Sequence, residues 1–316
     1  MTAKKTYLLS SLSLVVTVLL VLASKYALRF AFGNAYADSD HFVWIKQIII
    51  MYLVAIPAGI GVMCFIPRSA PEKHTLKFAE FIRFTLACYP LIVAGSLLGK
   101  ILTVIFTLGK SLLDPMQELM LENGSPLMYL TTIILAPVCE ELLFRKFLID
   151  GTVRYGEKAA ILFSAVTFGL FHANLSQIFY AAAAGLVFAY VYARTGKIRY
   201  TIFMHMIINA IGSLSSFILS RTVNVKELIS AILNGGRLEL SSYAVPMLIA
   251  FSLSAVLSAV IAVGVVMLVK TLRRLKFERA EYELQKGEII NTVYLNVGFI
   301  VFSAYCLIKT VINLMG

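Results

Sequence analysis

Two adjacent glutamates stand in an otherwise apolar stretch of the sequence, APVCEELLFRKFL, at positions 136–148. Arg145 follows Glu141 by four residues, which is the spacing and the order that favour an ion pair on one face of a helix. Glu140 points about 100° away from Glu141 around the same helix. We therefore expect Glu141 to pair with Arg145 and Glu140 to face a cavity.

Two further segments carry histidines. VTFGLFHANLSQ places His172 four residues after Phe168, and IFMHMIINAIGS places His205 and Asn209 on one helical face. Within the apolar segments these are the only histidines, and the two glutamates are the only carboxylates. Carboxylate and imidazole together can activate a water molecule, directly or through a metal ion. The pattern therefore predicts hydrolysis.

The residue types allow two versions of that chemistry. Glu140, His172 and His205 could ligate a zinc ion, Zn2+, that holds water at its fourth position. Alternatively, Glu140 and His172 could polarise water without a metal, while His205 and Asn209 donate hydrogen bonds to the oxyanion. Both versions need a water-filled cavity.

The composition identifies the surroundings of these residues. Of the 316 residues 59% are hydrophobic and only 14% are charged, and the mean hydropathy is +0.86. Such a chain has too much apolar surface for one aqueous core, so lipid must be its solvent. An ionisable group inside a membrane costs about 2.5–3.5 kcal/mol, so the glutamates should face the bundle interior or a wet cavity.

Charge and cysteine usage exclude other classes of protein. The net charge of +11 comes from basic residues between apolar segments, which indicates membrane topology and no nucleic-acid partner. The four cysteines are scattered singly, so neither a disulfide framework nor a paired-cysteine metal site is predicted.

The sequence predicts an all-α, polytopic transmembrane bundle of about nine spans. The apolar segments cover residues 7–24, 44–66, 84–107, 126–149, 159–173, 177–193, 200–220, 244–269 and 290–313. We expect one membrane domain with three parts: N-terminal spans at 1–125, a core at 126–220 that holds the site, and C-terminal spans at 221–316. Counted from the span ends, Glu140, His172 and His205 would lie about 15, 20 and 8 Å deep, so tilting must bring them together.

Basic residues alternate along the chain and predict its orientation. They cluster before the first apolar segment and after the second, fourth, sixth and eighth, so these connections should be cytoplasmic, with the N-terminus inside and the C-terminus outside. The charged loop 270–288 is expected to form a helix on the cytoplasmic surface of the membrane. The predicted location is the plasma membrane, with lipid as a partner.

Three short motifs carry a family resemblance. EELLFR fits EExxxR, FGLFH fits FxxxH and HMIIN fits HxxxN, in this order on successive helices. In this respect the chain resembles the CPBP family, which comprises the type II CAAX prenyl proteases and the bacteriocin-processing or self-immunity proteins, also called Abi. The resemblance covers residues 126–215 and leaves the flanking spans unmatched.

The resemblance implies an intramembrane endopeptidase, either a metalloprotease or a glutamate-dependent enzyme. Its implied site residues all lie in the three motifs: Glu140, Glu141, Arg145, His172, His205 and Asn209. The first glutamate and the FxxxH histidine would activate water. The HxxxN histidine and asparagine would stabilise the oxyanion or help to bind metal, and the second glutamate with the arginine would hold the site together.

Other functions are compatible with the same residues. The protein could be a non-catalytic scaffold or a bacteriocin self-immunity protein that binds a membrane partner. A third hypothesis is a transporter whose carboxylates relay protons, which would predict internal pseudo-symmetry that the sequence does not show. As a peptidase, it would act on a CAAX-like, bacteriocin or other membrane-associated peptide, which could be lipidated.

Overall fold

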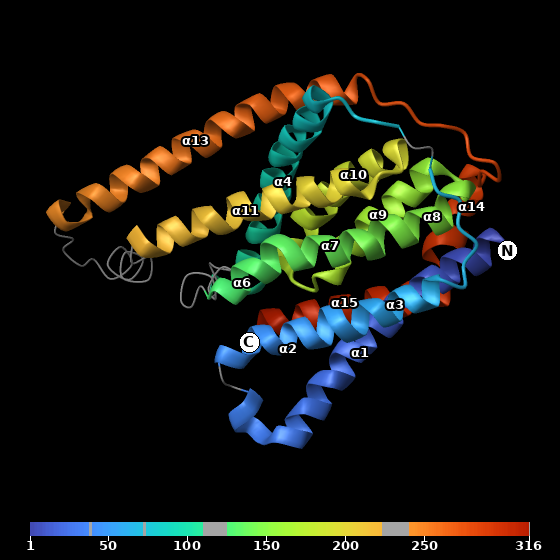
Figure 1. Ribbon diagram of the computed structural model, residues 1–316, viewed down its shortest axis with the longest axis horizontal. Coiled ribbons are helices and arrows are strands. Elements are labelled where there is room, and N and C mark those ends of the chain that lie inside the picture. The colour runs from blue at the N-terminus through green and yellow to red at the C-terminus, as the bar shows by residue number, and fades with distance from the viewer. Residues whose placement is uncertain (38–39, 72–73, 110–124, 223–239, 316) are drawn as a thin grey trace.

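The computed structural model of the protein describes residues 1–37, 40–71, 74–109, 125–222 and 240–315 (Figure 1). Throughout these residues the regular structure is helical and contains no strand. The fold is therefore the predicted all-α, polytopic bundle. The expected outer connections at 110–124 and 223–239 lie outside the described residues.

Eight helices within these described ranges are long and apolar enough to cross a membrane. Five are α1 (Ala3–Ala37), α4 (Phe78–Phe106), α10 (Leu175–Thr195), α11 (Ile198–Thr222) and α15 (Val297–Met315). Another is α13 (Leu240–Leu272), and one combines α2 (Asp40–Gln47), the π-helical η1 (Ile48–Ala55) and α3 (Ile56–Met63). The eighth runs from Pro126 to Tyr155 and carries the glutamate pair.

The remaining predicted span, 159–173, folds as the shorter helix α9 (Glu157–Phe171). Its 15 residues extend about 22 Å, less than the thickness of a bilayer core. Residues 172–174 join α9 to α10, and the two helices form a tightly packed hairpin. The two ends of the chain lie apart along the long axis of the molecule (Figure 1).

Proline and π-helical turns interrupt the helix that bears the glutamates. α6 (Pro126–Leu130), η2 (Thr131–Leu135), α7 (Ala136–Glu141), η3 (Leu142–Phe147), α8 (Leu148–Thr152) and the 3-10 turn η4 (Val153–Tyr155) follow one another without a break. Pro137 has no backbone N–H to donate, which favours the irregular turn before it. The glutamates thus lie at the end of a short α-helical piece between two π-helical turns, a feature common at functional sites.

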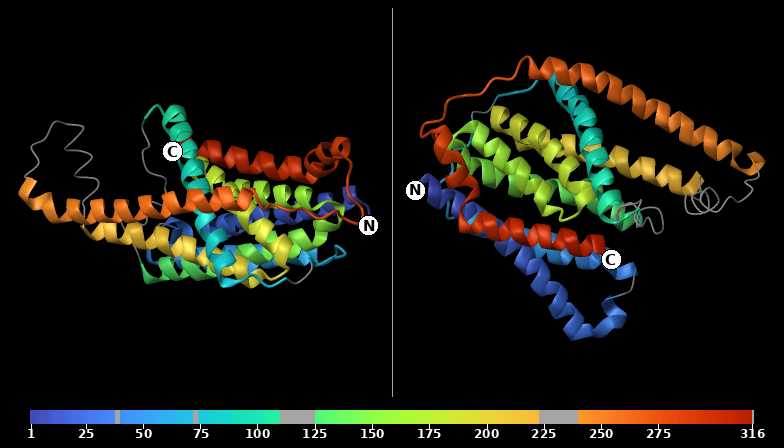
Figure 2. Two further views of the ribbon diagram at one scale, coloured as in Figure 1. Left: turned by 90° about the horizontal axis from the view of Figure 1, so that it is seen from above. Right: turned by 180° about the vertical axis from the view of Figure 1, so that it is seen from behind.

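Close helix packing positions α10 against its neighbours. A Cβ atom at Gly169 of α9 would lie 2.6 Å from the backbone oxygen of Ile178, and one at Gly99 of α4 would lie 2.7 Å from that of Leu175. On the other side of α4, α13 approaches equally closely at Gly264, where a Cβ would lie 2.5 Å from the backbone oxygen of Leu86. Figure 2 shows α13 crossing α4 in both views.

The loop after α13 differs from the prediction. Residues 273–285 do not form the expected surface helix; α14 is limited to Lys286–Ile289, and the π-helical turn η5 (Ile290–Tyr294) follows. The loop is held instead by tertiary hydrogen bonds, because Tyr282 N donates to Arg154 O and Leu284 N donates to Tyr155 O, each at 3.0 Å. We call residues 273–285 the strap, because they cross the beginning of α9 and the end of α10.

Candidate active site

Glu141 lies at the centre of a buried polar chain. Its Oε2 is 3.2 Å from Arg145 Nε, and its Oε1 is 3.1 Å from His205 Nδ1. The side chains of Glu141 and Arg145 are both fully buried. Each carboxylate oxygen therefore has a partner of its own, and the predicted ion pair forms even though η3 begins between the two residues.

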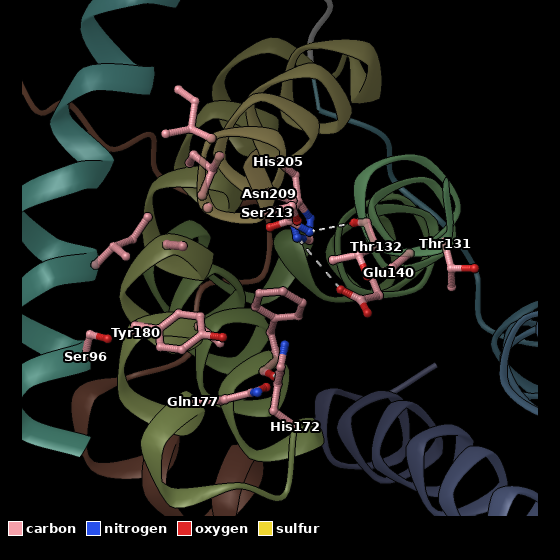
Figure 3. Close-up of a pocket in the computed structure, with 18 of the residues that line it drawn as sticks. Ser96, Thr131, Thr132, Glu140, His172, Gln177, Tyr180, His205, Asn209 and Ser213 are labelled. Atoms are coloured by element: carbon pink, nitrogen blue, oxygen red, sulfur yellow. Dashed lines mark hydrogen bonds and ion pairs between the residues drawn. The ribbon is translucent and has the colours of Figure 1, made fainter. Parts of the chain in front are cut away.

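Glu140 faces a cavity, as the helical offset from Glu141 predicts. Its side chain lines the cavity and is 13% exposed, and its Oε2 is 3.9 Å from His205 Nε2. The imidazole of His205 thus lies between the two glutamates, with one ring nitrogen toward each. Figure 3 shows its interaction with Glu140. Glu141 can orient this ring while Glu140 keeps its carboxylate toward the cavity.

His172 directly follows the last residue of α9 and lines the same cavity. Its Nδ1 is 2.9 Å from the backbone oxygen of Phe168. Because a carbonyl can only accept, Nδ1 carries the hydrogen, and in the neutral ring Nε2 is the acceptor. The ring of Phe168 contacts both histidines, at centroid distances of 5.0 Å to His172 and 5.7 Å to His205.

Asn209 follows His205 by one turn of α11 and also lines the cavity. Its Nδ2 donates to the backbone oxygen of Thr132 at 2.9 Å, an interaction drawn in Figure 3. An amide nitrogen carries two hydrogens, so the second one is available to another acceptor. The bond also ties α11 to η2, directly before the glutamate-bearing α7.

Aromatic rings enclose the guanidinium of Arg145. Its central carbon lies 4.3 Å from the ring centroid of Phe168, 5.4 Å from that of Phe188 and 6.0 Å from that of Phe144. Neither terminal nitrogen has a hydrogen-bond partner among the described residues, so the ring faces are the contacts that balance this end of the cation. Phe188 lies outside all three motifs, and the sequence analysis did not identify it.

The cavity has a volume of about 500 Å³ and continues beyond the predicted residues. Hydroxyl and amide side chains line much of it, including Gln47, Ser96, Thr131, Gln177, Ser213 and Ser216. These come from α2, α4, η2, α10 and α11, so five separated elements form the wall. A cavity of this size and polarity can hold a short peptide segment and water.

The metal prediction needs three converging ligands. No group of three His, Cys, Asp or Glu side chains in the described residues is arranged to hold a metal ion. Glu140 and His205 lie close together, whereas the hydrogen bond of His172 is to its own helix. In this conformation Glu140, His172 and His205 do not form a ready zinc site, so the chemistry below includes no step through a metal.

Comparison with known proteins adds a family relationship to this geometry. Residues 122–211 match the family model described as Type II CAAX prenyl endopeptidase Rce1-like. The chain is also 33% identical over 115 residues to a Bacillus subtilis (strain 168) protein named "Putative membrane peptidase YdiL". That match covers 35% of this chain and 46% of the relative, so the chain spans about half the length of that protein. No solved structure matches the chain.

Proposed function

We propose that the protein is an intramembrane endopeptidase. Two similarities support the proposal: residues 122–211 match the Rce1-like family model, and the Bacillus subtilis relative is named as a putative membrane peptidase. The observation that carries the proposal is the unequal environment of two adjacent glutamates. Glu141 has both oxygens engaged by Arg145 and His205, whereas the carboxylate of Glu140 faces the cavity.

Glu140 is the general base of the proposed reaction. It takes a proton from a water molecule, the water oxygen attacks the carbonyl carbon of the peptide bond, and a tetrahedral oxyanion forms. His172 lines the same cavity, and its Nε2, an acceptor in the neutral ring, can accept a hydrogen bond from the second O–H of that water, which stays on the oxygen during the attack. When the C–N bond breaks, protonated Glu140 returns its proton to the leaving amine.

His205 and Asn209 are the proposed donors to the oxyanion. Glu141 accepts from His205 Nδ1, so a protonated ring has its Nε2–H available on the cavity side. Asn209 has a second amide hydrogen beyond the one given to Thr132 O. Donors that are fixed before the reaction stabilise developing negative charge most effectively, and removal of one typically costs about 10²–10³ in kcat.

Replacement of the proposed base tests the function. Glu140→Gln keeps the size of the side chain but cannot accept a proton, so cleavage should be lost while expression and membrane insertion are retained. Glu283→Gln, a substitution of the same kind in the strap, should leave cleavage unchanged. Full biological activity in Glu140→Gln would contradict the peptidase and favour a scaffold or self-immunity function.

The proposed substrate is a membrane-associated peptide, CAAX-like, bacteriocin-derived or of another kind, that is cleaved at the plasma membrane. Purified protein in detergent should be given matched peptides with and without a prenyl group. Cleavage of the prenylated member alone would support a CAAX-like substrate. Equal cleavage of both would show that the lipid is not recognised.

Zinc dependence is a separate part of the proposal. A zinc-dependent version needs His172 to move toward Glu140 and His205, since the three do not form a ligand set here. The metal content of purified protein and its cleavage rate with a chelator distinguish the two versions. Cleavage by a zinc-free preparation would eliminate the metal and leave the glutamate mechanism in place.

A further inference from the structure

We infer that Phe188 is a positioning residue that holds His205 and Arg145 in the geometry that hydrolysis needs. This inference rests on the proposed peptidase function and extends it to α10, which contributes no residue to the three motifs. Phe188 is 1% exposed and lines the cavity, so its ring lies at the border between the buried polar chain and the cavity.

Phe188 and Phe168 contact the imidazole of His205 in different ways. The ring of Phe188 lies 5.2 Å from the imidazole at an interplanar angle of 33°, which is close to stacking. Phe168 meets the same imidazole edge-on, at 5.7 Å and 87°. One ring therefore covers a face of His205 and the other contacts it at right angles, so the imidazole cannot rotate without displacing a buried aromatic side chain.

Rotation of that imidazole would break the site in two places. The hydrogen bond between His205 Nδ1 and Glu141 Oε1 would be lost, and His205 Nε2 would leave its position 3.9 Å from Glu140. The hydrogen bond to Glu141 restrains one ring nitrogen, and the inclined ring of Phe188 restrains the plane of the imidazole. Both restraints are needed to aim Nε2 into the cavity.

Phe188 also covers the cation that anchors Glu141. Its ring centroid lies 5.4 Å from the central carbon of Arg145, whose terminal nitrogens have no hydrogen-bond partner in the described part of the chain. Gly185 precedes Phe188 by three residues and lies on the same face of α10. A Cβ atom at Gly185 would lie 3.4 Å from Arg145 Nη2, so this face of α10 is shaped to fit the guanidinium.

The test compares variants that remove or retain the ring. Phe188→Met and Phe188→Leu keep an apolar side chain without a ring, whereas Phe188→Tyr keeps the ring. We expect the ring-free variants to lose about 10- to 100-fold in kcat, with KM nearly unchanged, since misplacement of a catalytic group by about 1 Å has costs of this size. Phe188→Tyr should restore most of the rate.

Phe163→Met is the matched control. Phe163 is also a fully buried phenylalanine, but it packs against Tyr7 and Phe299, away from the cavity. The Phe163→Met substitution should lower the melting temperature as much as Phe188→Met does, but kcat should change little. An equal loss of kcat in both variants would show that Phe188 is an ordinary core residue and would overturn the inference.

A spectroscopic measurement makes the test independent of cleavage. The chain has four histidines, so the ring-nitrogen NMR signals of His205 can be assigned by their absence in His205→Asn. We expect one sharp set of His205 ring-nitrogen signals, from one fixed ring orientation, in the wild type and in Phe188→Tyr, and averaged signals in Phe188→Met. Unchanged His205 signals in both ring-free variants would refute the inference. If no peptide is cleaved by the wild type, the proposed function fails, and these spectra still decide the role of Phe188.

Discussion

At the scale of single residues, the two adjacent glutamates of the site differ only in their surroundings. Glu141 is fully buried between a cation and an imidazole, and Glu140 is partly exposed to a cavity. A buried ion pair gives little net stability when intact, but removal of one partner leaves an uncompensated charge. The two glutamates should therefore differ in stability as well as in activity.

Glu141→Gln should destabilise the protein more than Glu140→Gln does. The first substitution leaves the buried guanidinium of Arg145 without its counter-charge, a loss of about 3–5 kcal/mol for comparable buried pairs. Among the described residues the carboxylate of Glu140 pairs only with His205 Nε2, at 3.9 Å, so its loss should cost far less. Thermal melts of both variants in detergent measure the difference. The reverse order would contradict the assignment of the two roles.

The sequence alone predicted contacts between residues of one helix, because their spacing along the chain determines whether they share a face. The four-residue separation of Glu141 and Arg145 predicted their ion pair, and the offset of Glu140 predicted that it faces elsewhere. Phe188 could not be found in this way, because its contacts come from other helices and it is one of 21 phenylalanines in a strongly apolar chain. The contact of Glu141 with His205 likewise joins residues 64 positions apart.

At the scale of elements, the hairpin of α9 and α10 determines where His172 lies. Gly169 stands three residues before His172, at the closest approach of the two helices. A glycine at this point allows the backbones to meet. Any larger side chain must push α10 away and move Phe188 with it.

Gly169→Ala should therefore lower the melting temperature and the cleavage rate. Its Cβ would lie 2.6 Å from Ile178 O, which is too close for real atoms, so the helices must separate. Gly61→Ala in α3 is the control, because nothing lies within 4 Å of a Cβ there. That control should be neutral or stabilising by up to about 1 kcal/mol, the usual helix preference of alanine over glycine. Equal melting temperatures for the two variants would exclude a packing constraint at Gly169.

The strap shows how tertiary contacts replaced a predicted helix. Its charged residues find partners on α9 and α10, since Arg194 Nη1 is 2.6 Å from Glu278 Oε1 and 3.7 Å from Glu157 Oε1. The backbone N–H of Glu278 also donates to Glu157. Pattern alone could show that the segment is charged and lies at a surface. It could not show that backbone groups elsewhere would bind it in an extended form.

The same contacts predict a pH dependence of stability. Burial raises the pKa of Glu157 in the folded state, against the opposing effects of Arg194 and the Glu278 N–H. Between the ordinary pKa and this raised value the folded state binds more protons than the unfolded state, so stability falls as the pH increases through that window. The melting temperature of the wild type minus that of Glu157→Gln should therefore decrease as the pH rises through this window. A difference that stays constant or rises with pH would refute this assignment.

At the scale of the whole molecule, the packing of the helices brings together residues that a count along the predicted spans places at different depths in the membrane. Counting along the predicted spans separated Glu140, His172 and His205, whereas in the structure all three line one cavity. The short length of α9, which ends at Phe171 directly before His172, contributes to the difference. Composition predicted the helical class and the spans, but these arrangements depend on packing between helices.

The topology can be tested at the ends of the chain. The N-terminus and the C-terminus lie apart along the long axis of the molecule (Figure 1), as the predicted topology of nine passes requires when α9 is added to the eight long helices of the described residues. With the N-terminus in the cytoplasm, an added cysteine after Met315 should react with a membrane-impermeant thiol reagent in intact cells. One placed before Lys4 should react only after lysis. Labelling of both in intact cells would contradict this topology.

The charge of the cavity wall has a consequence for inhibitor chemistry. Glu140 is the only acidic side chain among the described residues of the wall, and no lysine or arginine occurs among them. The carboxylate of Glu140 would repel a carboxylate warhead, whereas a protonated amine or amidine could pair with it in place of the proposed water. Peptide analogues with a basic group in place of the scissile amide are therefore the preferred starting compounds for a selective inhibitor.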